Sequence, residues 1–258
     1  MNRSVVAALL LGALPVLPAL ARAEEPVGND LPRAWEHEGS DLPPHPAIRF
    51  GALDNGVRYA LMSNAEPDRR VYVRMHVDAG SVAEEESERG MAHFLEHMAF
   101  NGSANFPAGT LVEWLQERGL DFGAHTNAYT SFTETVYMLD LPNSDPRTLQ
   151  EALWVMRDFA GELLLAEEEV EAEKGVIDGE ERERDSAMAR VGKELLKRQL
   201  AGTRIAERLP IGVKDARDAF TAESVRAFYE RWYRPENLTL VIVGDLGDLD
   251  PLPVVELT

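Results

Sequence analysis

The order of secondary-structure signals along the chain predicts a mixed α/β fold (α+β), in which helices pack on one mainly antiparallel sheet. Segments of alternating apolar residues and segments of helical spacing follow one another as strands, helices, strand, helices and strand. The chain has 258 residues, of which 45% are hydrophobic, and this is enough for a substantial buried core. A disordered chain and a small disulfide-stapled domain are therefore excluded.

Charge and cysteine content restrict the partners and the cofactors. The 45 acidic residues outnumber the 26 basic ones and give a formal charge of −19. Nucleic-acid binding needs a basic face, so we expect no nucleic-acid partner. Because the chain has no cysteine, a transition metal must be held by histidine and carboxylate groups. The candidate imidazole ligands are His37, His45, His76, His93, His97 and His125.

Residues 1–23 are predicted to be a cleaved secretory signal peptide. Arg3 precedes an apolar run, which ends at a small-x-small site, Ala21-Arg22-Ala23. The run has about 16 apolar residues and two prolines, whereas a membrane span needs roughly 20 apolar residues. We therefore expect a periplasmic or secreted protein with no stable membrane anchor. Residues 24–47 contain five prolines and predict an extended, proline-rich leader.

The folded domain is expected over residues 48–247, followed by a truncated or irregular tail over residues 248–258. Asn55-Gly56 between two alternating segments is a strong hairpin signal. The segments with a strand pattern are residues 49–53, 57–61, 71–77, 133–141 and 238–243. The segments with helical spacing are residues 90–99, 109–118, 146–165, an acidic stretch at 167–200, and 222–232.

The segment with the clearest chemistry is the pattern H-x-x-E-H formed by His93, Glu96 and His97. On a helix, residues i and i+4 lie on one face, so the two imidazoles can bind one ion. Glu96 lies at the edge of this face, where its carboxylate can act as a general base on a metal-bound water. The pattern is the inverse of the zincin motif H-E-x-x-H. The alternative is a pair of ordinary surface histidines on an amphipathic helix.

A catalytic zinc ion needs a third protein ligand, and the acidic stretch offers candidates. Glu173 and Glu180 are seven residues apart, which is two helical turns, so they share a face. The residues between them are less polar than the flanks, as expected where a helix packs inward. One of the two can ligate the metal while the other supports the site by hydrogen bonding.

With these motifs in place, the sequence resembles the pitrilysin, insulinase and mitochondrial processing peptidase family of inverzincin zinc metallopeptidases, in particular the N-terminal half of a bacterial exported member. The match covers almost all of the expected mature chain. The segments that carry it are residues 89–103, 105–107, 127–132, 135–137, 173–180, 209–212 and 228–238.

The resemblance implies a fold, a metal site and a substrate site. The fold is the single repeat unit of the pitrilysin-like metallopeptidases. The resemblance further implies that His93, His97 and Glu180 bind one Zn²⁺, that Glu96 is the general base, and that Glu173 supports the site. It also implies that an edge strand binds the substrate through Asn127, Ala128 and Tyr129.

The function implied by the resemblance is a zinc-dependent endopeptidase that hydrolyses peptides or unfolded proteins. In this family a second homologous half closes over the first, so we expect a partner chain or a homo-oligomer to supply it. The alternative is a noncatalytic or truncated peptide-binding subunit that needs this second half. A structural zinc site is disfavoured because it has no need of Glu96 and fills its fourth position with another ligand.

Overall fold

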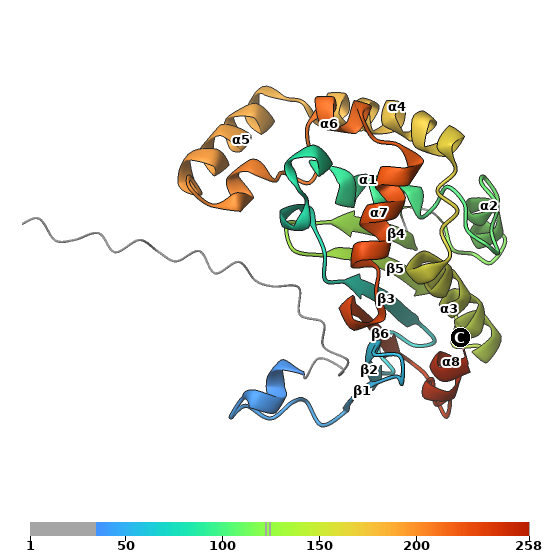
Figure 1. Cartoon of the computed structure of the whole chain (residues 1–258). Helices are drawn as coiled ribbons and strands as arrows, with labels where there is room; N and C mark the ends of the chain where they lie inside the picture. The colour runs from blue at the N-terminus through green and yellow to red at the C-terminus, as the bar shows by residue number, and fades with distance from the viewer. Residues whose placement is uncertain (1–34, 122, 124, 258) are drawn as a thin grey trace, which may run out of the picture. The chain divides into compact units, whose positions relative to one another are not determined.

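The structure is a computed structural model, and it describes residues 35–121, 123 and 125–257. The expected signal peptide and the first part of the leader lie outside the described residues. Within the described part, a six-stranded sheet supports a set of helices (Figure 1). The mainly antiparallel α+β fold predicted from the sequence is therefore confirmed.

The sheet has the strand order β1-β2-β6-β3-β5-β4, and only the β2–β6 pair is parallel. The last strand in the sequence lies between β2 and β3, so the two ends of the domain are joined within one sheet. The strand β4, by contrast, forms an open edge. The strands are β1 (Ile48–Ala52), β2 (Arg58–Ser63), β3 (Val71–Val77), β4 (Thr126–Thr130), β5 (Thr135–Leu141) and β6 (Leu238–Gly244).

The helices cover one face of the sheet. Along β3, every second residue from Val71 to Val77 is buried while the intervening residues are half-buried, which is the pattern of a sheet with one covered face. Phe159 of α3 packs on Tyr137 of β5, with ring centroids 5.0 Å apart. The helices are α1 (Met91–Met98), α2 (Leu111–Gln116), α3 (Pro146–Gly161), α4 (Glu167–Arg184), α5 (Ala187–Gln199), α6 (Lys214–Asp218), α7 (Ala222–Trp232) and α8 (Leu252–Leu257).

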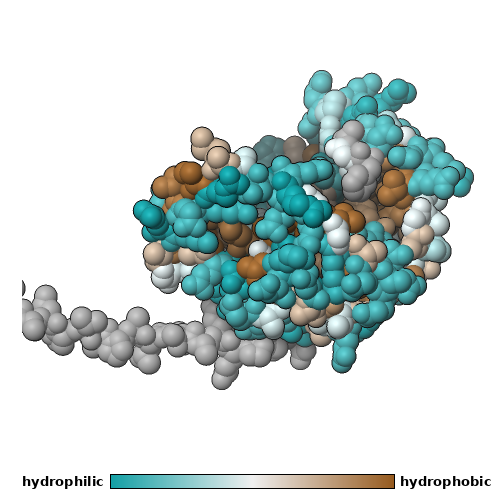
Figure 2. Space-filling view, turned by 90° about the horizontal axis from the view of Figure 1, so that it is seen from above, coloured by the Kyte–Doolittle hydropathy of each residue, from teal (hydrophilic) through white to brown (hydrophobic). Residues whose placement is uncertain are grey.

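The acidic stretch is two helices, and the prediction of one helix over residues 167–200 is wrong. The helix α4 ends at Arg184, and Asp185 has an extended backbone. The side chain of Ser186 then accepts a hydrogen bond from the N–H of Ala189 and caps a new helix, α5. Figure 2 shows a mostly hydrophilic face, with the hydrophobic residues in separate patches.

Both ends of the described chain have more structure than the sequence predicted. The tail expected to be irregular contains α8, because Asp250 accepts the N–H of Leu252 and Val255 is buried in the core. In the leader, Trp35 packs on Phe50 of β1 with ring centroids 4.7 Å apart, and a 3₁₀ turn (Glu36–Gly39) follows it. No helix within the described residues is long and apolar enough to cross a membrane.

Candidate metal centre

The short helix α1 carries three of the predicted site residues, and its N-terminus is firmly held. Gly90 precedes the helix with a φ of 103°, a left-handed conformation that favours glycine. The buried carboxylate of Glu84 accepts the N–H groups of Gly90 (2.9 Å) and Ala92 (3.0 Å). These donors would otherwise be unpaired at the start of a buried helix. His93, Glu96 and His97 therefore lie directly after a helix start that Glu84 holds in place.

The helix α4 presents Glu173 and Glu180 on the side that packs against α1. Ile177, one turn from each of them, is completely buried, and Glu173 is 7% exposed. The two-turn spacing therefore places both carboxylates in the space between the two helices, as the sequence predicted.

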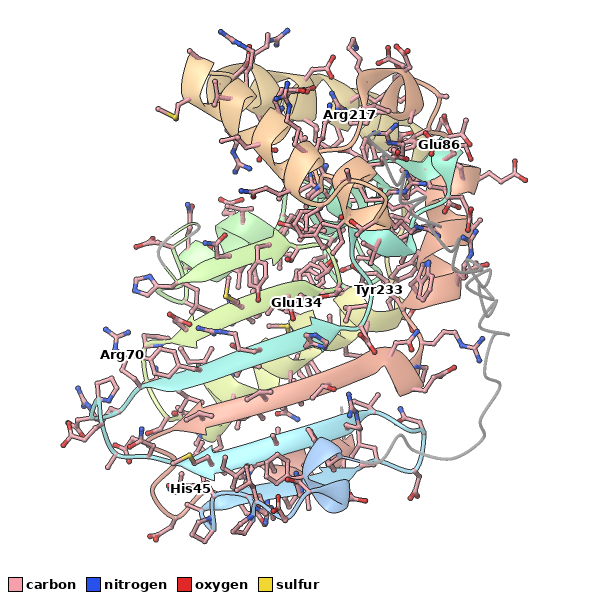
Figure 3. All side chains as sticks on the ribbon, turned by 90° about the vertical axis from the view of Figure 1, so that its left-hand side faces the viewer. His45, Arg70, Glu86, Glu134, Arg217 and Tyr233 are labelled. Carbon is pink, nitrogen blue, oxygen red and sulfur yellow. The ribbon has the colours of Figure 1, made fainter. Side chains whose placement is uncertain are left out.

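The buried side chain of Arg217, on α6, holds α4 in place through its guanidinium (Figure 3). Its guanidinium donates to Asp178 at 2.9 Å and to Glu181 at 2.6 Å, both on α4. It also donates to the carbonyl oxygen of Ile211 at 2.7 Å. A single cation thus joins α4 to the turn that contains Ile211.

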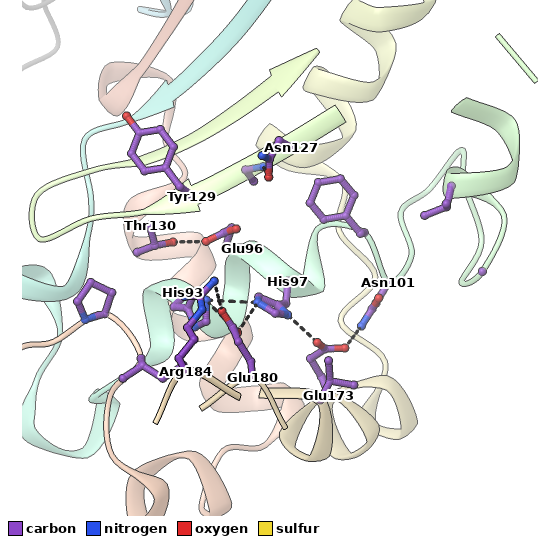
Figure 4. Close-up of a pocket in the computed structure, with 17 residues that line it drawn as sticks. His93, Glu96, His97, Asn101, Asn127, Tyr129, Thr130, Glu173, Glu180 and Arg184 are labelled. Atoms are coloured by element: carbon purple, nitrogen blue, oxygen red, sulfur yellow. Dashed lines mark hydrogen bonds and ion pairs between the residues drawn. The ribbon is translucent and has the colours of Figure 1, made fainter. Parts of the chain in front are cut away.

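The structure brings His93, His97 and Glu180 together (Figure 4). The two Nε2 atoms are 3.3 Å apart, and Glu180 Oε2 lies 3.5 Å from His93 Nε2 and 3.4 Å from His97 Nε2. Ligand atoms bound tetrahedrally at about 2.0–2.1 Å from a zinc ion lie about 3.3 Å apart. Two nitrogens and one carboxylate oxygen at this spacing fit the donor set of a catalytic zinc site.

The hydrogen bonds around the three residues leave the ligand atoms available. His97 Nδ1 lies 2.8 Å from Glu173 Oε1, so in the neutral imidazole this nitrogen carries the proton and Nε2 has the lone pair. Asn101 donates to the other oxygen of Glu173 at 2.6 Å. Arg184 contacts Glu180 Oε1 at 2.7 Å, while the buried Oε2 has no well-formed hydrogen bond within the described part of the chain. Burial of the Glu180 Oε2 atom without a hydrogen bond costs folding free energy unless a cation lies next to it.

Burial and neighbouring charges separate the pKa values of the two imidazoles. Burial, together with the adjacent His97, lowers the pKa of His93 to about 4. Burial also acts to lower the pKa of His97, but the hydrogen bond with Glu173 and the nearby carboxylate of Glu180 outweigh burial and raise this pKa to about 9. His97 in turn holds the pKa of Glu180 below its usual value. The carboxylates of Glu173 and Glu180 therefore place negative charge next to His97, where a metal ion can replace the proton of the imidazole.

Glu96 lies beside the three candidate ligands and is 8% exposed. Thr130 Oγ1, at the end of β4, donates to Glu96 Oε2 at 2.7 Å. Burial raises the pKa of Glu96 above its ordinary value, and the hydrogen bond from Thr130 opposes this shift. A raised pKa suits a carboxylate that takes up a proton and returns it in one reaction cycle.

All of these groups face a cavity of about 630 Å³. The edge strand β4 forms one wall, and it places Asn127, Ala128 and Tyr129 along the cavity. Apolar side chains form other parts of the wall. They include Phe100, Val112, Val176, Pro210 and Ile211.

The remaining histidines do not line this cavity. His125 Nδ1 lies 4.0 Å from Asp121, and His76 Nε2 lies 3.1 Å from Glu134. His45 is near the opposite end of the sheet from Arg217 (Figure 3). In the described ranges, the group of His93, His97 and Glu180 is the only cluster of three metal-binding side chains.

For three polar side chains of the site, those of Asn101, Thr130 and Arg184, the sequence predicted no contact with the predicted catalytic and metal-binding residues. Asn101 and Thr130 stand in segments that carry the family resemblance, but their partners are 72 and 34 residues away along the chain. Arg184 is one turn from Glu180, so its i,i+4 pairing was the one visible signal.

This fold, with a His-His-Glu cluster next to a buried carboxylate, is that of a metallopeptidase, and comparison with known proteins establishes the family. The chain belongs to the insulinase family of peptidases (peptidase family M16), whose sequence model matches residues 59–209, more than half of the chain. The model of the peptidase M16 inactive domain matches residues 219–250. The resemblance stated from the motifs is confirmed.

The relatives are longer than this chain. A probable zinc protease, PqqL, from Haemophilus influenzae is 38% identical over 201 residues, which are 78% of this chain and 22% of the relative. The crystal structure of the first half of the periplasmic protease PqqL from Escherichia coli matches with a TM-score of 0.80 and 37% identity, over 83% of this chain and 46% of that one. A mutant of the ferredoxin protease FusC in complex with Arabidopsis ferredoxin matches with a TM-score of 0.74 and 30% identity, over 80% of this chain and 22% of that one. This chain thus spans about a fifth of the curated relative's length.

Proposed function

We propose that this chain is the zinc-binding part of a metalloendopeptidase that hydrolyses peptides or unfolded proteins. The observation that carries the proposal is the convergence of His93 Nε2, His97 Nε2 and Glu180 Oε2, 3.3–3.5 Å apart, beside the buried carboxylate of Glu96. Membership of a peptidase family and the name of the Haemophilus influenzae relative, a probable zinc protease, support it.

In this proposal, His93, His97 and Glu180 hold one Zn²⁺ and leave the side toward the cavity open. Bound zinc lowers the pKa of a water ligand and polarises the carbonyl of the scissile bond. Glu173 accepts the Nδ1 proton of His97 and so fixes the orientation of this imidazole. Asn101 fixes Glu173 in turn.

Glu96 moves the proton. Its carboxylate accepts a proton from the attacking water and then donates it to the leaving amine, so that one residue acts first as a base and then as an acid. Burial, which excludes competing water, favours this role.

The substrate binds as an additional strand along β4. The residues Asn127, Ala128 and Tyr129 lie on an open edge of the sheet and line the cavity. Main-chain pairing with an edge strand gives affinity with little dependence on sequence, which suits a peptidase of unfolded chains.

The proposal also includes a second homologous half and export of the protein to the periplasm. The Escherichia coli first-half structure is about twice as long as the part that this chain matches, which supports a further homologous domain over the cavity. The periplasmic description of that relative and the expected signal peptide at residues 1–23 support a periplasmic location. The alternative remains a peptide-binding subunit without hydrolytic activity.

The substitution Glu96→Gln tests the proposed function. We expect zinc content to stay at one ion per chain while cleavage of a quenched-fluorescence peptide library falls by a factor of about 10²–10⁴. Glu168→Gln, which removes an exposed carboxylate of α4, is the matched control and should leave cleavage unchanged.

Two results would contradict parts of this proposal. Unchanged cleavage by the Glu96→Gln chain would exclude the general-base role. A wild-type chain that binds zinc and peptide but does not cleave would favour the peptide-binding subunit, unless addition of the second half restores cleavage.

A further inference from the structure

The last residue of the edge strand, Thr130, contacts the buried carboxylate beside the metal site. Its hydroxyl donates to Glu96 Oε2 at 2.7 Å, within the normal range for a bond to a charged acceptor. Within the described residues, this is the one hydrogen bond that Glu96 makes through its side chain. One carboxylate oxygen is therefore held, and the other is left to exchange a proton.

The hydroxyl of Thr130 is itself held in a defined place. Thr135, directly opposite on β5, lies 3.5 Å away and donates its own proton to the carbonyl oxygen of Ala79 at 2.9 Å. The single hydroxyl proton of Thr130 therefore goes to Glu96, because the carboxylate oxygen at 2.7 Å is a nearer and stronger acceptor than the Thr135 hydroxyl at 3.5 Å. The orientation of the carboxylate is thus set by the sheet as well as by α1.

The backbone of Thr130 faces the open edge of the sheet. The N–H of Asp140 bonds to the carbonyl of His125, and the N–H of Ser131 bonds to the carbonyl of Glu134. Hydrogen bonds of an antiparallel pair alternate along each strand, so in β4 the odd-numbered residues bond β5. The N–H and C=O groups of Thr130 consequently point to the edge where a further strand can pair.

We infer that Thr130 is a positioning residue that links the strand which receives the substrate to the group that moves the proton. The inference rests on the proposed function and extends it. The main chain of Thr130 is placed to pair with an extended peptide, and its side chain fixes Glu96. A peptide that pairs with β4 thereby also fixes the carboxylate next to its own scissile bond.

The substitution Thr130→Val, which keeps the branched shape and removes the hydroxyl, tests this link. We expect kcat to fall about 10- to 100-fold, because a general base that is misplaced loses much of its contribution. KM should stay within about twofold, since the main-chain groups of β4 are unchanged. Zinc content should remain at one ion per chain, and Thr130→Ser should restore most of kcat.

Thr126→Val is the matched control. Thr126 is on the same strand and the same face, it is 1% exposed, and its hydroxyl has no hydrogen-bond partner among the described residues. The same change there should leave kcat and KM unaltered. If Thr130→Val cleaves like the wild type, or if KM and kcat change together in both variants, the inference is wrong.

A double-mutant cycle tests the link without hydrolysis. Thr130→Val should raise the equilibrium constant of unfolding about fivefold in the Glu96 chain and leave it unchanged in a Glu96→Ala chain, because the lost hydrogen bond is absent there. Equal effects in both backgrounds would overturn the inference. A wild-type chain without cleavage would count against the proposed function alone, and the cycle would still decide the role of Thr130.

Discussion

The helices α4 and α5 follow one another in the chain and are both rich in charge, yet they differ in what holds them. The helix α4 buries Val170, Glu173 and Ile177 against the rest of the domain. The helix α5 buries no residue, although its apolar residues Met188 and Leu195 lie at helical spacing. A regular apolar pattern therefore does not by itself mean that a helix is packed, and a weakly apolar helix can carry the functional groups.

The difference between the two helices also lies in buried charge. Arg217 holds α4 through Asp178 and Glu181, and Glu84 holds the N-terminus of α1. The ion pairs on α5 are exposed, as in the contact between Arg190 and Asp185. Exposed pairs contribute about 0–1 kcal/mol each, whereas loss of one partner of a buried pair costs several times more. The site thus rests on helices that are held by buried polar and charged side chains.

The largest expected effect follows from removal of the cation that holds α4. Arg217→Met leaves Glu181 without its partner and Asp178 with Lys214 alone, and it should lower the free energy of unfolding by about 3–5 kcal/mol. Arg190→Met on α5 should change it by less than about 0.5 kcal/mol. Urea denaturation followed by circular dichroism measures both values. Similar losses in the two variants would remove the distinction between the helices.

A second comparison concerns the apolar side chains. Ile177→Ala empties a fully buried position of α4 and should cost about 2–5 kcal/mol. Leu195→Ala on α5 removes a side chain that is 52% exposed, and should change stability by less than about 0.5 kcal/mol. A cost above 1 kcal/mol for Leu195→Ala would show that α5 is packed in solution.

The third effect is a pH dependence that originates at the start of α1. Burial raises the pKa of Glu84 from 4.5 to about 8, against the opposing N–H donors of Gly90 and Ala92 and the nearby charge of Arg208. A folded-state pKa above the unfolded value gives stability that is present below pH 4.5 and is lost as the pH rises through about 8.

We therefore expect the free energy of unfolding to decrease between pH 5 and pH 8, with a contribution from Glu84 on the order of 3 kcal/mol. Glu84→Gln should remove this part of the pH dependence, and denaturant titrations at several pH values measure it. An equally steep pH dependence in the variant would assign the effect to other groups.

Most of the sheet and the helix α1 could be predicted because each is encoded by a local pattern. Alternation marks β3, and the four-residue spacing of His93 and His97 marks the metal-binding face of α1. The break between α4 and α5 was missed because the capping residue, Ser186, stands in a stretch that otherwise favours helix. Here the choice of a local cap decides the boundary, and the charge pattern on either side does not reveal it.

Only the site residues that belong to a local sequence motif could be predicted. The spacing of Glu173 and Glu180 placed both on one face, but which one faces the imidazole nitrogens depends on how α4 packs on α1. The roles of Thr130 and Arg217 depend on contacts 34 and 39 residues distant in the sequence. Contacts of this kind arise from the tertiary fold and leave no periodic signal in the sequence.

Zinc binding by a variant of Glu180 is the most direct test of the central claim, that α4 delivers the third ligand to the two imidazoles of α1. The zinc content of the purified chain should be one ion per chain, measured by atomic emission after dialysis, and competition with a chelator should give the affinity. Glu180→Ala should weaken zinc binding by more than the roughly 10- to 100-fold typical of supporting residues, whereas Glu194→Ala on α5 should leave it unchanged. Wild-type zinc affinity in the Glu180→Ala chain would contradict the account.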